Sequence, residues 1–586
     1  MGDQGSEVLP LLGQVAAAVS EAVGRVRPEL EGVDPVVRRS DRADFQSNVA
    51  LPLAKRVQGK PVELAGEIAA VLSATVASVE VSGPGFLNIG VADSAIWAQV
   101  AARLGHPRLG VAASEAGRRT VIDYSAPNVA KEMHVGHLRT TIIGDSLARV
   151  LDFLGAAVIR QNHLGDWGTQ FGMLIQYLDE HPDTHWHQDE VGSGSSAVSA
   201  LDTLYKAARK EFDVDTEFAD RARARVVALQ SGDPATRAAW TTIVAESEKA
   251  FDAVYARLGV LLTADDYVGE SFYNSMLADT IAELVDKGIA VDSDGALVVF
   301  SETVTGPDDK PVPLMVRKGD GGYGYDTTDL ATIRYRLAHL HAERLLYITD
   351  SRQALHFRLI FETARRAGWL TPSTEAEHIA FGTVLGPDGR PFKTRAGGTV
   401  RLTDLLDDAV AHARAIVAEK NPHLPAAELD EIAEQAGIGA VKYADLSTSR
   451  LKDYTFDLDR MVALTGNTGV YLQYAHARIH SILRKSDAGA SAIDPTVALQ
   501  PAERALALGL DAYNDAITQV AKTLEPHHLC VYLYNLARTF TTFYETCPVR
   551  TAPDPIRANR LALCHLTART LAHGLSLLGI PAPHRM

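Results

Sequence analysis

Short apolar strands alternate with amphipathic helices from residue 118 onward, and this alternation restricts the fold more than any other feature. RTVIDYS predicts a strand, and HLRTTIIGDSLARVLDFLG predicts a helix that stops at Gly155. AVIRQN and TQFGMLIQYL repeat the pair, and RLLYITD, ALHFRLIFETARRAG and HIAFGTVL continue it. Strand–helix alternation indicates a doubly wound parallel sheet, in which ligands bind at the carboxyl ends of the strands.

A chain of 586 residues is longer than one hydrophobic core usually supports, so we expect several domains. Three other stretches depart from the strand–helix pattern. Residues 1–110 combine helical spacing with short strands around a Pro-Gly turn, which predicts a small α+β domain. From about 180 to 300, a loop containing Gly and Ser and then polar helices predict an insertion between two halves of one nucleotide fold. Residues 426–586 are almost all helical and predict a separate bundle, in which 506–524 form one amphipathic helix. The sheet with its insertion would then occupy residues 111–425.

The charge and cysteine content limit the partners and the compartment. The chain has 73 acidic and 57 basic residues, a formal charge of −16, which argues against non-specific coating of nucleic acid. A local basic face would still suffice for an RNA partner. No apolar run is long enough to span a bilayer, and the acidic N-terminus lacks a signal peptide, so we expect a cytoplasmic protein without membrane contact. Cys530, Cys547 and Cys564 are widely spaced and predict buried thiols.

The stretch YSAPNVAKEMHVGHLRTT, residues 124–141, contains two histidines that could bind a metal, bind a phosphate, or simply start a helix. Zinc helices usually carry HExxH, whereas His134 and His137 are three apart across a glycine at a strand-to-helix turn. The first N–H groups of the helix and its dipole favour an anion there. Gly136 allows close approach of a nucleotide, both histidines could donate to phosphate oxygens, and Lys131 adds positive charge.

A second basic loop, LGPDGRPFKTRAGGTV at residues 385–400, supports the phosphate interpretation. It combines glycines with Lys393 and Arg395. Alone it could be a solvated turn, but together with the first site it is typical of a mobile clamp for β- and γ-phosphates. The sequence contains neither GxxxxGK nor GxGxxG after a strand, which argues against a P-loop ATPase and a dinucleotide enzyme.

Several long motifs, in order, resemble those of bacterial arginyl-tRNA synthetases. HVGH resembles the HIGH signature of class I aminoacyl-tRNA synthetases, and the basic loop stands where that class carries KMSKS. DYSAPNVAKEMHVGHLRTTIIGD, NHLGDWGTQFGMLI, YDTTDLATIRYR, FKTRAGGTV, IGAVKYADLS and GNTGVYLQYAHAR extend the resemblance nearly end to end. The fold it implies is a multidomain α/β protein with a Rossmann-like, HIGH-type nucleotide-binding sheet. KMSKS is reduced to FKTRAG, where only Lys393 corresponds, and Lys131 stands where the family's compensating lysine precedes HIGH.

The resemblance implies ATP-dependent ligation of L-arginine to its tRNA through arginyl-adenylate, with release of AMP and pyrophosphate. Asp123 and Asp329 would hold the planar guanidinium, with Tyr325 packed nearby. Asn128 and Gln353 would hold the α-amino and carboxylate groups. On the residues alone, Asp329 could be a charge on a helix face and Tyr325 ordinary core.

The same resemblance implies the residues that handle Mg²⁺-bound ATP. The expected ATP-binding residues are His134, Gly136, His137, Val384 and Lys393. The expected catalytic stabilisers of developing charge are His134, His137, Lys131, Lys393 and Arg395. The acceptor would be the terminal 2′-hydroxyl of the tRNA, and activation in this family usually requires bound tRNA. We expect no tightly bound, protein-ligated metal and a monomeric protein.

The helical C-terminal segment resembles the family's anticodon-binding bundle. Tyr471 and Tyr474 match positions that contact anticodon bases, and stacking on aromatic rings commonly holds unpaired bases. Arg478, Arg484 and Lys485 would contact phosphates. Taken by itself, this helix could equally be a core aromatic stripe with a solvated basic face.

Two more segments are expected to meet the tRNA. Met586 ends IPAPHRM, which resembles the family's C-terminus near the anticodon, and the N-terminal domain would contact the tRNA elbow. Phe86 and Asn88 are candidates for contacts with the D-loop. The remaining histidines, the pair His476 and His480 and the loop HWHQDE, are expected to be structural rather than metal ligands.

Two other functions share some of these features. A HIGH-type nucleotidyltransferase could adenylate a small acid without RNA, but such enzymes are usually shorter and lack a helical tail. A catalytically silent RNA-binding paralogue would not need the intact HVGH, Asp123, Asn128 and Lys131.

Overall fold

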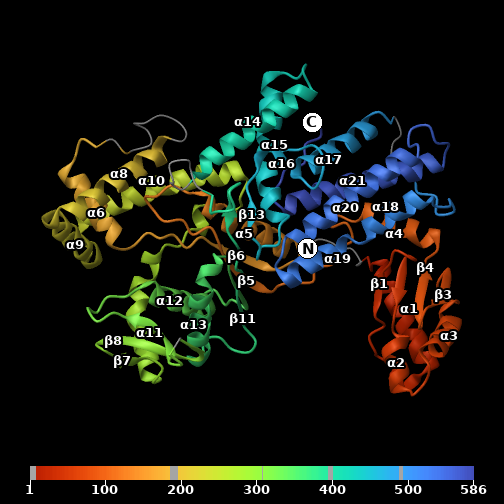
Figure 1. Cartoon of the computed structure of the whole chain (residues 1–586), viewed down its shortest axis with the longest axis horizontal. Helices are drawn as coiled ribbons and strands as arrows, with labels where there is room; N and C mark the ends of the chain where they lie inside the picture. Colours follow the sequence, from red (N-terminus) through yellow and green to blue (C-terminus); the bar gives the residue numbers. More distant parts are fainter. Residues whose placement is uncertain (1–7, 185, 187–195, 307, 393–399, 487–491) are drawn as a thin grey trace.

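Four parallel strands form the central sheet that the alternation predicts. Their order is β11-β10-β5-β6, with bounds Glu375–His378, Arg344–Tyr347, Arg119–Asp123 and Ala157–Gln161. The structure, a computed structural model, describes residues 8–184, 186, 196–306, 308–392, 400–486 and 492–586. The sheet lies in the middle of an elongated molecule (Figure 1), so the doubly wound parallel fold is confirmed.

Helices pack on this sheet as the apolar spacing predicts. Those that follow its strands are α5 (Val135–Phe153), α6 (Thr169–Glu180) and α13 (Ala354–Arg366), the last preceded by the turn η4 (Ser351–Gln353). Leu138, Ile142 and Leu151 on α5 are fully buried, and Gly155 ends the segment with a φ of 92°. HIAFGTVL is not one strand, because the central sheet ends at His378 and Val384–Leu385 (β12) instead pairs with Tyr454–Thr455 (β13).

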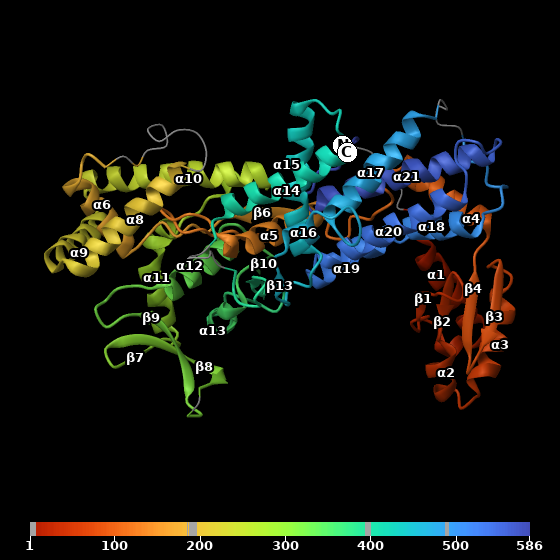
Figure 2. The same ribbon diagram turned by 45° about the horizontal axis from the view of Figure 1, so that its top comes forward.

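The segment between β6 and β10 contains a helical part and a small sheet. The helices are α8 (Ser196–Val214), α9 (Thr216–Ser231), α10 (Pro234–Leu258), α11 (Asn274–Asp286) and α12 (Tyr325–Ala338), with short turns η2 (Ala264–Asp266) and η3 (Glu270–Tyr273). The strands β7 (Val291–Ser293), β8 (Ala296–Thr305) and β9 (Pro311–Arg317) form an antiparallel sheet that the sequence analysis did not predict. This sheet projects from the body on the side of α11 and α13 (Figure 2).

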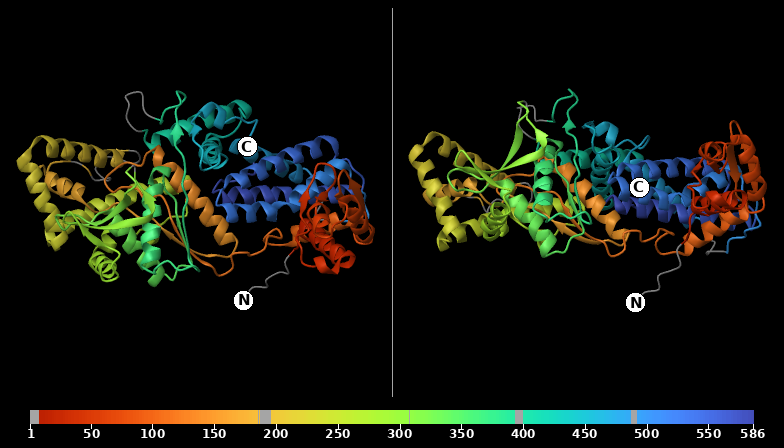
Figure 3. Two further views of the ribbon diagram at one scale, coloured as in Figure 1. Left: turned by 60° about the horizontal axis from the view of Figure 1, so that its bottom comes forward. Right: turned by 90° about the horizontal axis from the view of Figure 1, so that it is seen from below.

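The N-terminal domain is the predicted α+β unit. Its elements are α1 (Leu11–Val26), η1 (Pro28–Leu30), β1 (Val37–Arg39), β2 (Phe45–Ser47), α2 (Ala50–Arg56), α3 (Pro61–Leu72), β3 (Ser78–Ser82) and β4 (Phe86–Gly90). The strands pair antiparallel in the order β1-β2-β4-β3. This domain and the helices α6, α8 and α9 lie at opposite ends of the molecule (Figure 3).

The rest of the described chain is helical, with α4 (Asp93–Gly105) from the N-terminal part packed against it. Its helices are α14 (Leu402–Lys420), α15 (Ala426–Leu446), α16 (Leu458–Met461), α17 (Gly469–Arg484), α18 (Pro501–Asp511), α19 (Tyr513–Thr523), α20 (His527–Thr546) and α21 (Ile556–Leu577). The single helix predicted over 506–524 is wrong, since Ala512 separates α18 from α19. The three cysteines are free and buried, as predicted.

Buried polar contacts join the sheet to the helical part. The Nε of Arg139 on α5 lies 3.2 Å from the Oδ1 of Asp445 on α15, and both side chains are almost completely buried. Lys442 Nζ donates to the carbonyls of Leu258 and Gly579, each at 2.7 Å. Burial lowers the pKa of Lys442 to about 8. The helix that begins at HVGH is therefore tied directly to the C-terminal domain.

Candidate active site

The loop between β5 and α5 has an unusual backbone. Ser125, Ala126 and Ala130 have φ values of 75°, 48° and 62°, the left-handed region that side chains other than glycine rarely adopt. Each such residue costs about 1–3 kcal/mol, and such residues cluster where surrounding structure fixes a functional geometry. Their N–H groups donate at 3.1, 2.8 and 3.0 Å to side-chain oxygens of Thr140, Asn162 and Ser247, respectively.

Tyr255 on the insertion helix α10 completes this support. Its hydroxyl lies 2.6 Å from Ser125 Oγ and accepts from Asn162 Nδ2 at 3.0 Å. The loop is thus held by the sheet, by α5 and by α10 together. These supporting residues carry no sequence motif, and the sequence analysis did not identify them.

The two histidines of HVGH cap the N-terminus of α5. His134 Nδ1 accepts a hydrogen bond from the backbone N–H of Gly136 at 3.0 Å. His137 Nδ1 accepts from the backbone N–H of His134, also at 3.0 Å. The ring centroids are 4.0 Å apart. The two histidines therefore do start the helix. The same cap is compatible with anion binding, because it places both side chains at the positive end of the helix dipole.

Burial determines the charge of both rings, and the caps determine which ring nitrogen carries the proton. Burial lowers the pKa of His134 and, with the charges of His134 and Lys131, lowers that of His137 to about 3. Both rings are neutral at pH 7, and their Nδ1 atoms accept, so the proton of each ring lies on Nε2. Each histidine can therefore offer one ring N–H to a ligand oxygen.

Gly136 and Lys131 flank the pair. A Cβ at Gly136 would lie 2.7 Å from the His134 ring, so a side chain there would displace the cap. The Lys131 ammonium lies 4.7 Å from the ring centroid of Tyr205 on α8. Lys131 also lowers the pKa of both histidines, which places its charge close to the helix start.

Asp123 closes the carboxyl end of β5 and is almost completely buried. Its Oδ2 accepts from Arg336 Nη2 at 2.6 Å, and Arg336 on α12 also donates to Gln161 at 2.5 Å. This ion pair fastens α12 to the sheet. The carboxylate of Asp123 is therefore already paired with Arg336. Any other guanidinium that binds Asp123 must share this carboxylate with Arg336.

Asp329 and Tyr325 lie on the first turns of α12. Asp329 Oδ2 lies 2.6 Å from His356 Nε2, and Asp326 Oδ1 lies 3.1 Å from His356 Nδ1. Tyr325 is 68% exposed, which excludes the core interpretation, and its ring centroid lies 5.2 Å from that of His356. Asp329 is partly buried and paired rather than a free charge on a helix face.

Glu270 is a residue of this region that the sequence analysis missed. Burial, together with the charges of Asp166 and Asp329, raises its pKa to about 7. Asp166 accepts from Ser271 N–H at 2.8 Å, so its position is fixed. A half-buried acid beside two other carboxylates is a strong indication of a site for a cation. VGESFYN carries no pattern that would have revealed this from sequence.

The other residues predicted to bind small molecules lie in segments that follow the carboxyl ends of the strands. Asn128 is exposed in the loop before HVGH, and a Cβ at Gly165 would lie 2.5 Å from its Oδ1. Gln353 is exposed in the turn after β10, and Val384 is 5% exposed in β12. Lys393 and Arg395 lie outside the described residues.

The predicted tRNA contacts have mixed environments. Tyr474 on α17 is 42% exposed, whereas Tyr471 is half-buried with its ring 5.8 Å from that of Tyr534. The Arg478 guanidinium lies 4.8 Å from the Tyr544 ring centroid. Arg484 is the last residue of α17, Lys485 is its C-cap, and Met586 ends the chain. HWHQDE falls largely outside the described residues.

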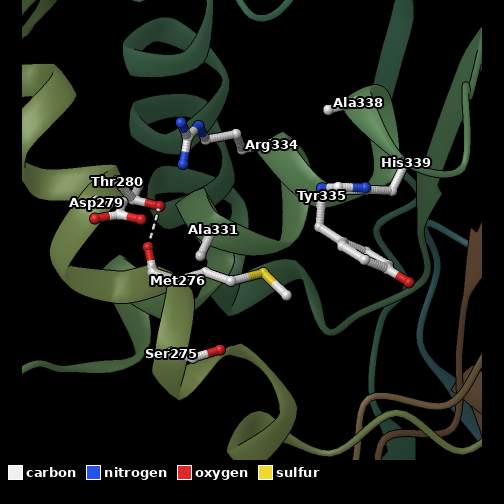
Figure 4. A pocket seen from close by; sticks show the side chains of 9 residues that line it. All are labelled: Ser275, Met276, Asp279, Thr280, Ala331, Arg334, Tyr335, Ala338 and His339. Atoms are coloured by element: carbon white, nitrogen blue, oxygen red, sulfur yellow. Dashed lines mark hydrogen bonds between the residues drawn. The ribbon is translucent and has the colours of Figure 1, made fainter.

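In the N-terminal domain, Asn88 is bonded within the sheet. Its Oδ1 accepts from Gln46 and its Nδ2 donates to Ser82 Oγ, at 2.8 and 3.0 Å. Phe86 is half-buried at the start of β4. A pocket between α11 and α12, lined by Met276, Asp279, Arg334 and Tyr335 among others, contains none of the predicted residues (Figure 4).

Comparisons with known proteins cover all three parts of the chain. The family of class I (R) tRNA synthetase catalytic domains matches residues 99–458, the DALR anticodon binding domain matches 472–586, and the arginyl tRNA synthetase N terminal domain matches 13–91. An arginine–tRNA ligase of Frankia casuarinae is 69% identical over 99% of both chains, and one of Streptomyces coelicolor is 53% identical over 99% of this chain and all of the other.

Solved structures agree with these relatives. An arginyl-tRNA synthetase from Plasmodium falciparum superposes with a TM-score of 0.83 at 28% identity, covering 99% of this chain and all of the other. The arginyl-tRNA synthetase of Thermus thermophilus gives 0.79 at 28% identity, covering 98% of this chain and all of the other.

Proposed function

The chain belongs to the class I arginyl-tRNA synthetases, and from that premise we propose which of its residues carry out each part of the reaction. It ligates arginine to tRNA with ATP, by way of an enzyme-bound arginyl-adenylate. Two features at one edge of the sheet support the assignment of roles. A helix N-terminus offers two neutral N–H donors, and a group of carboxylates lies beside the first turns of α12.

The carboxylate group selects the amino acid. Asp329 and Glu270 meet the guanidinium, whose planar donors match carboxylate oxygens, and the exposed ring of Tyr325 covers it. Asp123 contributes from the floor, where it already holds Arg336. Asn128 and Gln353 hold the α-amino and α-carboxylate groups. A lysine side chain would leave carboxylate lone pairs unmet, which favours discrimination without an editing site.

The start of α5 and the second loop act on ATP. The carboxylate of arginine attacks the α-phosphate, its oxygen forms the new P–O bond, and pyrophosphate leaves with the bridging electrons. The Nε2–H groups of His134 and His137 donate to phosphate oxygens as charge develops there. Lys131 supplies positive charge from the loop, together with Lys393 and Arg395. Val384 and Gly136 line the nucleotide. Mg²⁺ accompanies ATP as part of the substrate and neutralises phosphate charge.

The terminal domains receive the tRNA. The exposed ring of Tyr474, with Tyr471, stacks on anticodon bases, while Arg478, Arg484 and Lys485 contact phosphates. Met586 lies beside this surface, and Phe86 and Asn88 meet the D-loop. The 2′-hydroxyl of the terminal ribose then attacks the adenylate carbonyl and releases AMP.

We also assign the protein to the cytoplasm, as a monomer. No helix among the described residues is long and apolar enough to cross a membrane. The three buried free thiols suit a reducing compartment.

Arginine-dependent exchange of pyrophosphate into ATP, measured with and without arginine tRNA, tests this function. We expect exchange that depends on arginine and is stimulated by tRNA. Asp329→Asn should raise the KM for arginine about 10–100-fold, the effect of losing one charge-assisted hydrogen bond, and leave the KM for ATP unchanged. Absence of both exchange and charging would refute the function itself.

Lys131→Ala separates the two halves of the site. It should lower kcat or raise the KM for ATP and leave the KM for arginine unchanged. Tyr205→Leu is its matched control, because it removes the ring that Lys131 contacts and keeps the lysine charge. An unchanged exchange rate in Lys131→Ala would remove this residue from the mechanism.

A further inference from the structure

Three histidines meet at the C-terminus, in a different domain from the catalytic site. His476 and His480 lie one turn apart on α17, and His584 is the third residue from the chain's end. One nitrogen from each ring lies within 4.8 Å of the other two. The rings of His480 and His584 stack with centroids 4.1 Å apart, and those of His476 and His480 are 4.5 Å apart. The C-terminus lies beside α15 and α17 (Figure 1).

The backbone of the tail fixes the orientation of His476, which is 1% exposed. Its Nδ1 lies 2.9 Å from the carbonyl oxygen of Pro583. A carbonyl can only accept, so Nδ1 carries the proton and Nε2 carries the lone pair. Histidines that bind metals are characteristically held by this kind of bond from the other ring nitrogen.

The tail is also bonded to α17 on either side of this point. Gln473 Nε2 donates to the carbonyl of Pro581 at 3.0 Å. Arg484 Nη1 donates to the carbonyl of His584, also at 3.0 Å. These bonds hold the backbone of His584 against the helix, so its ring reaches the other two without a large loss of chain freedom.

We propose that His476, His480 and His584 bind one divalent metal ion of the zinc type, which anchors the C-terminal tail to α17. Imidazole nitrogens suit zinc, copper and nickel rather than magnesium or calcium. Three nitrogens around one Zn²⁺ lie roughly 3.3 Å apart. The stacked rings of His480 and His584 must therefore rotate out of their parallel arrangement when both bind the ion. Water completes the tetrahedral set. This proposal differs from the expectation that the protein ligates no metal. That expectation considered HVGH, HWHQDE and the pair His476 and His480, but not His584.

The protonation of His476 and His480 is compatible with metal binding. Burial lowers the pKa of His476, and burial together with the charges of His476, His584, Arg484 and His565 lowers that of His480 to about 4. Neutral imidazole is the form that ligates. The nearby positive charge of Arg484 opposes a cation, so we expect affinity well below that of structural zinc fingers.

A second group, Glu525, His527 and His528, provides the matched control. Its members are neighbours at the start of α20, and both histidines pair with the same glutamate at 3.6 and 3.5 Å. These three residues lie close together because they are neighbours in sequence, whereas His476, His480 and His584 join α17 to the chain end.

Equilibrium dialysis of the full, untagged chain against Zn²⁺, and titration with Co²⁺ followed by its visible absorption, test the site. We expect one bound ion with a tetrahedral cobalt spectrum in the unaltered chain and in His528→Asn. His480→Asn and His584→Asn should weaken binding by more than the roughly 10–100-fold that loss of an outer partner costs. Zn²⁺ should also slow amide exchange in residues 580–586 of the unaltered chain and of His528→Asn, but not in His480→Asn or His584→Asn.

If substitutions at the less exposed histidines disturb folding, His584→Asn still tests the site, because His584 is exposed at the chain end. Equal binding by this variant and the unaltered chain would overturn the site. So would binding lost in His528→Asn but kept in His480→Asn, or no ion bound by the unaltered chain.

Discussion

Two groups of histidines, at the start of α5 and at the end of the chain, use the same ring atom in opposite ways. In the first group, His134 and His137 accept backbone N–H groups at Nδ1, which leaves a proton on each Nε2. In the second, His476 donates from Nδ1 to the carbonyl of Pro583, which leaves a lone pair on Nε2. The backbone partner therefore decides whether a buried neutral imidazole presents a donor to an anion or a lone pair to a cation. Spacing along the sequence does not decide it.

The largest expected effect tests the donor half of this comparison. His134→Asn retains a side-chain oxygen that can accept the Gly136 N–H, so the cap survives, but it loses the Nε2–H. We expect kcat for arginine-dependent pyrophosphate exchange to fall about 10²–10³-fold, the usual cost of one donor to a developing charge. Rates are to be measured at saturating ATP and arginine with tRNA present.

The melting temperature of His134→Asn is the control for this prediction. It should match that of the unaltered chain, because the cap is retained. A full exchange rate in a variant that melts normally would mean that His134 serves only as a cap.

A third histidine, His356, sharpens the comparison because carboxylates rather than backbone meet both of its nitrogens. Burial opposes its charged form, but the hydrogen bonds and charges of Asp326 and Asp329 outweigh burial and raise its pKa to about 9. Since the pKa rises on folding from 6.5, the stabilisation is fully present below about pH 6.5 and is lost as pH rises through about 9. We expect a loss of no more than about 3 kcal/mol in the free energy of unfolding across that range.

Urea unfolding of the unaltered chain and of His356→Gln at several pH values measures this loss. The difference in unfolding free energy between the two chains should shrink between pH 6.5 and 9. A difference that is constant with pH would show that His356 is uncharged when folded, like His134 and His137.

The sequence predicted those parts that local pattern determines. Apolar spacing located α5, whose Leu138 and Ile142 are buried, and Gly155 marked its end. The two wrong elements have physical reasons. Leu385 leaves the central sheet to pair with Thr455, and the apolar stripe over 506–524 continues through a break at Ala512 because both helices pack against α20.

The site residues divide in the same way. HVGH could be recognised because strand, loop, glycine and helix are consecutive. Glu270 could not, because its raised pKa comes from burial in the folded chain and from the charges of Asp166 and Asp329, which are distant in sequence. His584 joins His476 and His480 only through the path of the tail. Chemistry that arises from tertiary juxtaposition has no local signature.

The smallest expected effect isolates the structural half of the His134 role. His134→Ala removes both the ring donor and the acceptor for the Gly136 N–H, whereas His134→Asn removes only the donor. Exchange should fall equally in both variants, because Nε2–H is missing from each. Unfolding in urea should distinguish them, with His134→Ala less stable than His134→Asn by about 1 kcal/mol, the usual value of an N-cap. Equal stability would mean that the N-terminus of α5 is held by the bonds of the preceding loop and by the His137 cap, without a contribution from His134.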